Sequence, residues 1–369
     1  MFNRGLQPLR PLRHLLIAVV LAALAAPAWA QPASLPRVRL IATGGTISNR
    51  MGGRLTAEEL IKSIPDVARY ARPEFEQFAN LPSSALTLAQ WLQLARRINE
   101  VFREDRDLAG IVVTSGTDTL EETAYFLNLT VRASRPVVVV GSMRNPSTLG
   151  YEGAANLLEG IRVAAEPEAR GKGVLVVLND EINSAREVTK TDALRLETFQ
   201  SRSYGLLGVV DADRVVFYRQ PLKRHTADSE FDVSKIAELP RVDVVLVYQD
   251  APGDIITSAV EHGARGIVLA AAGAGATSGT QGQALSDAAS KGVFVVTSTR
   301  TGSGRVAAFR TAPQPATQAA AGNAAAPRPR GMLRIAAEDL APVKARILLM
   351  LALTQTNDAA EIQRMFTQY

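Results

Sequence analysis

The chain has no cysteine, only three histidines and few aromatic residues, which make up 5% of its 369 positions. Without cysteine no disulfide can form, so stability must come from packing and assembly. The histidines are far apart in the sequence and form no cluster with metal-ligand spacing: they are His14, His225 and His262. Because a metal site needs several ligands close together, we expect neither a metal ion nor a cofactor.

The chain also lacks an apolar run long enough to read as an ordinary membrane span. Residues 15–26 are apolar, follow three arginines and precede an Ala-Trp-Ala sequence, a pattern typical of a secretory signal that is cleaved after Ala30. Cleavage removes three arginines and no acidic residue, so the net charge falls from +5 to +2. A sequence pI of about 9.6 therefore does not indicate nucleic acid as a partner. We expect no membrane association after cleavage.

Strand-like and helix-like segments alternate along the rest of the chain, within a composition that is 47% apolar and sufficient for real cores. Such alternation argues for an α/β fold with mostly parallel sheets. The first series has buried strands at residues 38–42, 111–114, 137–140 and 174–178, and helices at residues 86–101, 120–127 and 154–164. The second has strands at residues 242–247, 266–271 and 293–297, helices near residues 256–262 and 281–289, and a closing helix begun by Pro342.

The two series predict two α/β domains. The larger N-terminal domain spans residues 31–222, a polar connector spans residues 223–240, and the C-terminal domain spans residues 241–369. Within the second domain, residues 311–330 are rich in alanine and proline and lack apolar periodicity, so we expect a mobile surface insertion there. A recognition loop is the alternative interpretation of that segment.

The first candidate site lies where the strand at residues 38–42 runs into a Thr-Gly-Gly-Thr sequence. Glycines at such a place let backbone N–H groups approach a ligand closely. Its second threonine, Thr46, is positioned as a nucleophile if a nearby group accepts the hydroxyl proton. The same pattern also fits a plain tight turn.

Two further segments carry polar residues in a similar way. The strand at residues 111–114 runs into a Ser-Gly-Thr-Asp-Thr loop just before a predicted helix. Asp118 and Thr119 are good helix caps, so the plain interpretation is that this loop only caps the helix. The third segment places Lys190 among small hydroxyl residues, although a lone lysine is more often a solvated surface charge.

Together these segments closely resemble the bacterial type II L-asparaginases. The sequences ATGGTIS and TSGTDTLEETAYFL look like that family's two signatures, and REVTKTDALRLETF, KRHTADSEFDVSKIAELP and KARILLMLALTQTND are also similar. The resemblance covers residues 38–369, with its segments in the same order. It implies two α/β domains, with the active site at the carboxyl ends of the first domain's strands, where open α/β sheets generally bind ligands. It also implies a periplasmic homotetramer built from two close dimers.

The activity that the resemblance implies is hydrolysis of L-asparagine to L-aspartate and ammonia through a threonine acyl-enzyme. Thr46 is then the first nucleophile, which forms the acyl intermediate. Thr117, Asp118 and Lys190 form a second hydroxyl–base group, in which a buried neutral amine accepts the hydroxyl proton.

Substrate contacts are implied in the same way. Backbone N–H groups from Gly116 to Asp118 stabilise the oxyanion, and Asp118 also binds the substrate's α-ammonium. Ser83 matches the serine that binds the α-carboxylate, with Ser84 beside it as a further candidate. Gly116, Thr117 and Asp118 therefore belong to both the binding site and the catalytic loop.

The mobile lid departs from the family pattern. The tyrosine that assists the first threonine has no counterpart, since the next tyrosine here is Tyr70. Residues 49–54 are shorter and more basic than the family's lid. Arg50 and Arg54 are therefore candidates to influence the hydroxyl or hold the substrate carboxylate, but a permanently charged arginine cannot serve as the base.

Other departures lie at the substrate end of the site. Ser115 stands where the second signature usually carries histidine, and Ala276 stands where the family has an asparagine that reaches the neighbouring subunit's site. The second-domain acid near the ammonium site is also missing, since no Asp or Glu occurs between Arg300 and Glu338.

Three functions remain open at this point: an asparagine-specific amidohydrolase, a glutaminase-asparaginase or hydrolase of another small amide, and a periplasmic amino-acid-binding protein on the same scaffold. Retention of Thr46, Thr117, Asp118 and Lys190 favours a catalyst, because a site that had lost turnover is expected to have lost at least one of them.

Overall fold

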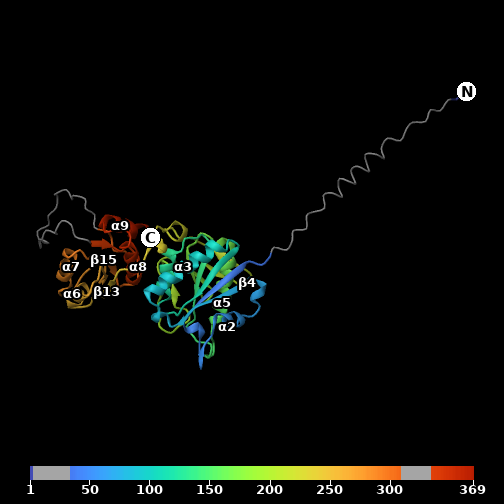
Figure 1. Cartoon of the computed structure of the whole chain (residues 1–369), viewed down its shortest axis with the longest axis horizontal. Coiled ribbons are helices and arrows are strands. Elements are labelled where there is room, and N and C mark those ends of the chain that lie inside the picture. The colour runs from blue at the N-terminus through green and yellow to red at the C-terminus, as the bar shows by residue number, and fades with distance from the viewer. Residues whose placement is uncertain (3–33, 309–333) are drawn as a thin grey trace. The chain divides into compact units, whose positions relative to one another are not determined.

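The structure is a computed structural model that describes residues 1–2, 34–308 and 334–369 (Figure 1). The expected signal sequence beyond Phe2 and the alanine- and proline-rich residues 311–330 lie outside the described residues. The chain divides into Met1–Leu35 and a second unit, Pro36–Tyr369, which holds both sheets.

The larger sheet has eight strands in the order β12-β11-β8-β7-β6-β5-β1-β4. The strands from β7 to β4 are parallel, whereas β8, β11 and β12 join antiparallel at the other end. The bounds are β1 Arg37–Gly44, β4 Arg72–Leu81, β5 Leu108–Thr114, β6 Val137–Val140, β7 Val174–Leu178, β8 Glu181–Ser184, β11 Gly208–Val210 and β12 Val215–Phe217. The four buried strands predicted for this region are confirmed.

Helices cover both faces of this sheet. Ile41 and Val113 pack with α3 and α4 on one face, while their neighbours Leu40 and Val112 pack with α2 and α5 on the other. Burial on both faces explains why the strands are continuous apolar runs. The predicted start of helix α3 is residue 86. The helix begins at Leu88 instead, because the Thr87 side chain caps it. The helix bounds are α2 Ala57–Lys62, α3 Leu88–Glu104, α4 Leu120–Thr130 and α5 Gly153–Ala165.

The edge strand β4 is additional to the predicted elements, since its charged sequence has no apolar run. Glu74 lies 2.7 Å from Arg39 of the adjoining strand β1. Glu76 lies 2.8 Å from Arg97 of α3. An edge strand can carry charged side chains in this way because it is only partly covered.

The second sheet has four parallel strands in the order β13-β14-β15-β16. Its strands are β13 Val242–Leu246, β14 Gly266–Ala271, β15 Phe294–Thr299 and β16 Arg334–Ala336, and its helices are α6 Asp254–Glu261, α7 Gln281–Ser290, α8 Pro342–Ala352 and α9 Ala359–Gln368. The predicted start of α8 at Pro342 is confirmed. Strand β16 and helix α9 are additional to the prediction.

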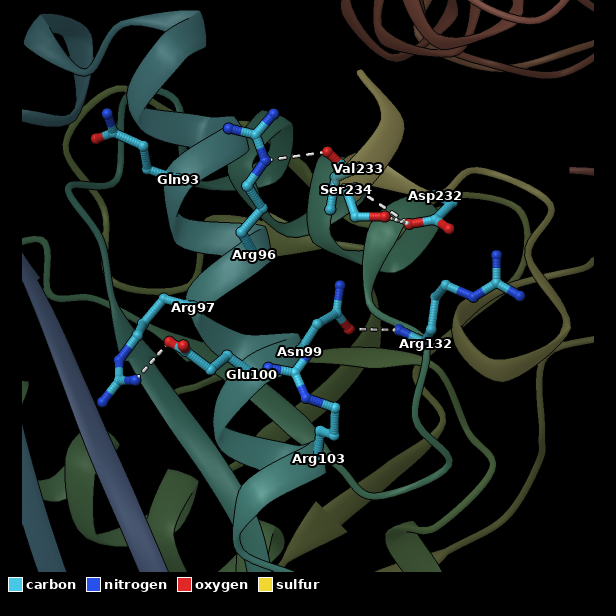
Figure 2. A pocket seen from close by; sticks show the side chains of 10 residues that line it. All are labelled: Gln93, Arg96, Arg97, Asn99, Glu100, Arg103, Arg132, Asp232, Val233 and Ser234. Carbon is cyan, nitrogen blue, oxygen red and sulfur yellow. Dashed lines mark hydrogen bonds and ion pairs between the residues drawn. The ribbon is translucent and has the colours of Figure 1, made fainter. Parts of the chain in front are cut away.

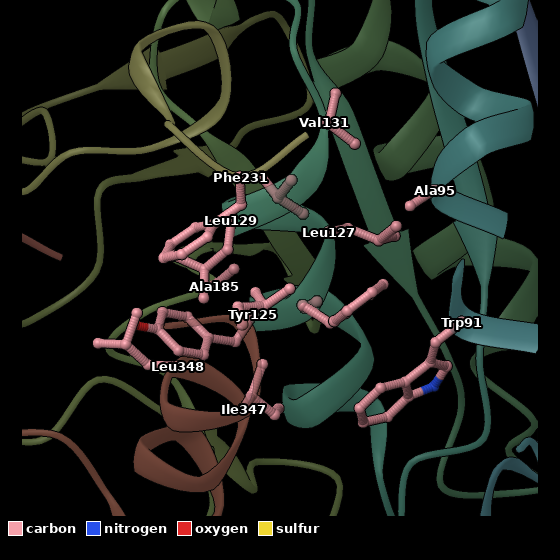
Figure 3. Close-up of a cluster of buried hydrophobic side chains, with 14 of the residues drawn as sticks. Trp91, Ala95, Tyr125, Leu127, Leu129, Val131, Ala185, Phe231, Ile347 and Leu348 are labelled. Carbon is pink, nitrogen blue, oxygen red and sulfur yellow. The ribbon is translucent and has the colours of Figure 1, made fainter. Parts of the chain in front are cut away.

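One hydrophobic core joins the two sheets. Tyr125, Leu127 and Leu129 of α4 belong to the same buried cluster as Ile347 and Leu348 of α8 (Figure 3). Full burial of an aliphatic side chain contributes about 1.5–3 kcal/mol. The packing therefore fixes α4, and with it the loop at its start, against a helix from the C-terminal part of the chain.

Candidate active site

Three loops meet at the carboxyl ends of the neighbouring strands β4, β1 and β5. The hydroxyl of Thr43 donates to the carbonyl of Thr114 at 2.6 Å, which ties the ends of β1 and β5 together. The N–H of Gly45 donates to the carbonyl of Leu81 at the end of β4, at 2.9 Å. A Cβ on Gly45 would lie 2.3 Å from the backbone nitrogen of Gly116, so only glycine allows these loops to approach so closely.

Lys190 connects two residues of the β5 loop. Its Nζ lies 3.0 Å from Oγ1 of Thr117 and 2.8 Å from Oδ1 of Asp118. The Lys190 side chain is 16% exposed and that of Asp118 is 77% exposed, whereas Thr117 is buried. Lys190 is therefore not a solvated surface charge. One amine joins a buried hydroxyl to a carboxylate that faces solvent.

Ser83 reaches the same loop from the end of β4. It is buried, and its Oγ accepts the N–H of Thr119 at 3.3 Å. Thr119 stands at the N-cap position of α4 as expected, but its buried hydroxyl has no hydrogen-bond partner among the described residues. The expectation that Asp118 and Thr119 side chains cap α4 is thus wrong, because the Asp118 carboxylate bonds Lys190 instead. Ser84, beside Ser83, is exposed.

Thr46 begins a short turn, Thr46–Ser48, directly after the glycine pair. It is half-buried, and its hydroxyl makes no hydrogen bond to a described residue. The turn is held through its backbone: Nη1 of Arg54 donates to the carbonyl of Gly45 at 3.3 Å. The first threonine therefore lies at the loop junction without a fixed partner of its own.

Tyr151 holds the same turn and is not among the predicted site residues. Its phenol donates to the carbonyl of Ile47 at 2.9 Å, and burial raises its pKa, so it acts as a donor and not as a base. Tyr70 lies instead against the guanidinium groups of Arg69 and Arg162. No local motif marks Tyr151, because only the fold brings the start of α5 to this turn.

The shortened lid is a small hairpin, in which β2 (Asn49–Arg50) pairs with β3 (Gly53–Arg54). The guanidinium of Arg50 lies 3.1 Å from Glu59 of α2. Of the two arginines that the sequence suggested, Arg54 is thus the one that contacts the first loop, through Gly45.

Glu121, in the first turn of α4, lies behind Lys190. Lys190 belongs to the short strand β9 (Thr189–Lys190), which pairs with β10 (Phe199–Gln200). Oε1 of Glu121 accepts the hydroxyl of Thr189 at 2.9 Å and the N–H of Lys190 at 3.3 Å. In the sequence, Glu121 is marked only by its place in the first turn of a helix, where an acidic residue is favourable.

A cavity of about 410 Å³ adjoins this cluster, and Glu121, Lys190 and Arg300 are among its lining residues. A larger hollow of about 690 Å³ lies along α3 and includes none of the candidate site residues (Figure 2). Two of its arginines already have partners: Arg96 donates to a backbone carbonyl at 3.0 Å, and Arg97 lies 2.7 Å from Glu100. Of the candidate site residues, Lys190 lines the smaller cavity and none lines the larger hollow.

In the part of the chain that the structure describes, no three metal-ligating side chains lie close enough together to hold an ion. Over the same residues, no helix is both long and apolar enough to cross a membrane.

Two family models match the chain: "Asparaginase, N-terminal" over residues 37–223 and "Glutaminase/Asparaginase C-terminal domain" over residues 241–366. An L-asparaginase 2 from Bacillus subtilis is 43% identical, with 91% of this chain and 87% of that protein covered. A glutaminase-asparaginase from Pseudomonas fluorescens is 38% identical, with 91% of each chain covered. The solved structure of a probable cytoplasmic L-asparaginase from Campylobacter jejuni has a TM-score of 0.82 and 39% identity, covering 90% of this chain and 100% of that one.

Proposed function

This chain belongs to the asparaginase family, and we propose that it hydrolyses L-asparagine to L-aspartate and ammonia through a threonine acyl-enzyme. The observation that carries the proposal is the Lys190 amine, which lies within hydrogen-bond distance of Thr117 and Asp118. A carboxamide is a poor electrophile, so its hydrolysis needs a nucleophile, a proton acceptor and donors for the oxyanion.

In the acylation step we assign Thr46 as the nucleophile. Its Oγ attacks the side-chain carbonyl carbon, and the hydroxyl proton passes to the amide nitrogen through water or the Thr117–Lys190 pair. The carbon–nitrogen bond then breaks, ammonia leaves, and the substrate acyl group remains as an ester on Thr46. Backbone N–H groups of residues 116–118 stabilise the oxyanion, a contribution of about 3 kcal/mol for each donor.

In the deacylation step water attacks the ester carbonyl. Lys190 serves as the base and accepts a proton through the Thr117 hydroxyl, and the departing Thr46 oxygen takes up a proton again. Asp118 suits the substrate's α-ammonium, because its carboxylate is exposed and shares one oxygen with Lys190. Ser83, and less directly the exposed Ser84, serve the α-carboxylate.

A glutaminase-asparaginase activity is the second candidate. Three relatives carry that name, and the hairpin at residues 49–54 lacks the family's lid tyrosine. Glutamine is longer than asparagine by one methylene, a difference that a pocket discriminates by only about 1–3 kcal/mol.

We further propose that the protein works in the periplasm as a homotetramer of two close dimers, with the domain boundaries at residues 222 and 241. The arginine-led apolar segment at residues 15–26 supports export. Light scattering of the protein lacking residues 1–30 measures the assembly, and a monomeric mass contradicts the tetramer.

Ammonia release by purified protein lacking residues 1–30 tests the function. We expect release with asparagine and less with glutamine, with other small amides as a comparison panel. Asparagine binding without ammonia release identifies a binding protein on this scaffold, and faster release from glutamine identifies the second candidate.

A further inference from the structure

We propose that Lys344, on helix α8 in the C-terminal part of the chain, is a positioning residue that acts through Glu121 to hold Lys190 against Thr117. The inference rests on the proposed function, since it assigns Lys190 a part in the reaction. It concerns a buried ion pair that joins the two halves of the chain behind the catalytic loop.

Lys344 is fully buried, which is unusual for a lysine. Its Nζ donates to the carbonyls of Arg186, at 3.0 Å, and Val188. It also lies 3.7 Å from Oε2 of Glu121, a carboxylate oxygen with no hydrogen-bond partner among the described residues. Burial lowers the pKa of Lys344 to about 8, while the neighbouring Glu121 carboxylate favours the charged form.

These contacts converge on the segment that carries Lys190. Lys344 holds the backbone at residues 186 and 188, and Glu121 holds the Thr189 hydroxyl and the Lys190 N–H. Four contacts, at residues 186, 188, 189 and 190, therefore hold this segment from the side of α4 and α8. At the front of this segment, Nζ of Lys190 reaches Thr117.

Other charges surround the pair but do not replace it. Arg186 and Glu187, which precede β9, act on Lys344, and the neighbouring Glu122 of α4 faces both Glu121 and Lys344. Arg186 is already engaged by Asp339 at 2.8 Å. Lys344 is the cation paired with Glu121, so its loss leaves this carboxylate without its counter-charge, a change that is costly for a buried ion pair.

An ion pair that only stabilises the fold and an ion pair that positions Lys190 predict different effects of mutation on stability and on kcat. An apolar pair of similar size is often as stable as a buried ion pair, so stability alone does not require charges at this junction. A catalytic amine, in contrast, loses about a hundredfold in rate when it is misplaced by about an ångström. Loss of the pair should therefore lower kcat more than it changes KM.

The test compares Glu121→Ala, Glu121→Gln and Lys344→Met with the control Arg346→Met. Arg346 is a second cation on α8 that also bonds a backbone carbonyl, that of Val242 at 2.9 Å, but it does not contact residues 186–190. For each protein, kcat and KM with asparagine and the melting temperature are measured. Crystal structures give the distance from Lys190 Nζ to Thr117 Oγ1.

We expect Glu121→Ala and Lys344→Met to lower kcat by about tenfold or more with little change in KM, and Lys190 Nζ to move away from Thr117. Glu121→Gln should recover part of the loss, because its amide oxygen still accepts the Lys190 N–H. Arg346→Met should leave both kinetic constants unchanged.

Wild-type kcat in folded Glu121→Ala, or an equal loss in Arg346→Met, overturns the inference. If Lys344→Met does not fold, the kinetic constants of the two Glu121 variants test the positioning role. If the wild-type protein releases no ammonia, the proposed function fails, and the crystallographic distance still decides the inference: an unmoved Lys190 refutes it.

Discussion

The two threonines of the site occupy loops of the same kind, yet their surroundings differ. Thr117 is buried and bonded to Lys190, whose segment is held from behind by Glu121. Thr46 is half-buried, and its turn is held by Arg54 and Tyr151 through carbonyl groups and by the Ser48 hydroxyl, which donates to Asn80 Oδ1 at 3.2 Å. The Thr117 hydroxyl is thus preorganised by its hydrogen bond, whereas Thr46 has a fixed backbone and a side chain with no hydrogen bond to a described residue.

This difference separates the two halves of the proposed reaction. Proton transfer through Thr117 depends on contacts that are already in place, which limits the reorganisation needed during the reaction. Attack by Thr46 depends on a contact that the substrate or a second subunit must supply. The comparison therefore predicts that attack by Thr46, and not proton transfer through Thr117, limits the rate of turnover.

The largest expected effect is that of Thr46→Ala. In the proposed mechanism the Thr46 hydroxyl forms the ester, so removing it should abolish turnover. The side chain makes no hydrogen bond to a described residue, so the melting temperature should stay near that of the wild type. Steady-state ammonia release and thermal melting measure these two results. Wild-type turnover in a folded variant refutes the assignment of the nucleophile.

Lys190→Met tests the Thr117–Lys190 pair. Methionine preserves much of the length and packing but lacks the amine, so we expect a loss on the order of a hundredfold in kcat. Thr117→Val should be similarly severe, since it deletes the hydroxyl and nearly keeps the shape. A loss below about threefold in Lys190→Met contradicts its role as the base.

The sequence alone predicted the alternating strands and helices and the polar loops that follow two of the strands. The buried parallel strands and Pro342 at the start of α8 follow from local patterns. The two polar loops predicted after strands β1 and β5 do meet, and Gly45 lies against Gly116 there. The contacts of Tyr151, Glu121 and Lys344 did not follow, because each joins segments far apart in the chain. The edge strand β4 was also missed, since its charged residues find partners only in the folded sheet.

Tyr151→Phe tests the turn that carries Thr46, and its expected effect is smaller. It keeps the ring but removes the donor to the Ile47 carbonyl, a hydrogen bond with a net contribution of about 1 kcal/mol. We expect a comparable loss of stability and a decrease in kcat of no more than about fivefold. Tyr218→Phe is the matched control, because that side chain is 64% exposed. An unchanged kcat in Tyr151→Phe shows that this contact does not prepare Thr46.

The smallest expected signal is a burst of ammonia before the steady state, which should be absent. Ammonia leaves when Thr46 is acylated, so its first turnover reports that step alone. Thr46 lacks the family's lid tyrosine, and Arg54, which is near its turn, is charged at any working pH and cannot accept its proton. The proton must leave through water or through Thr117 and Lys190, so acylation should be slower than hydrolysis of the ester. Rapid mixing with asparagine should then give a linear trace from the first turnover. A burst equal to the number of sites instead requires fast acylation, and with it a partner for Thr46 that forms only when substrate or a second subunit is present.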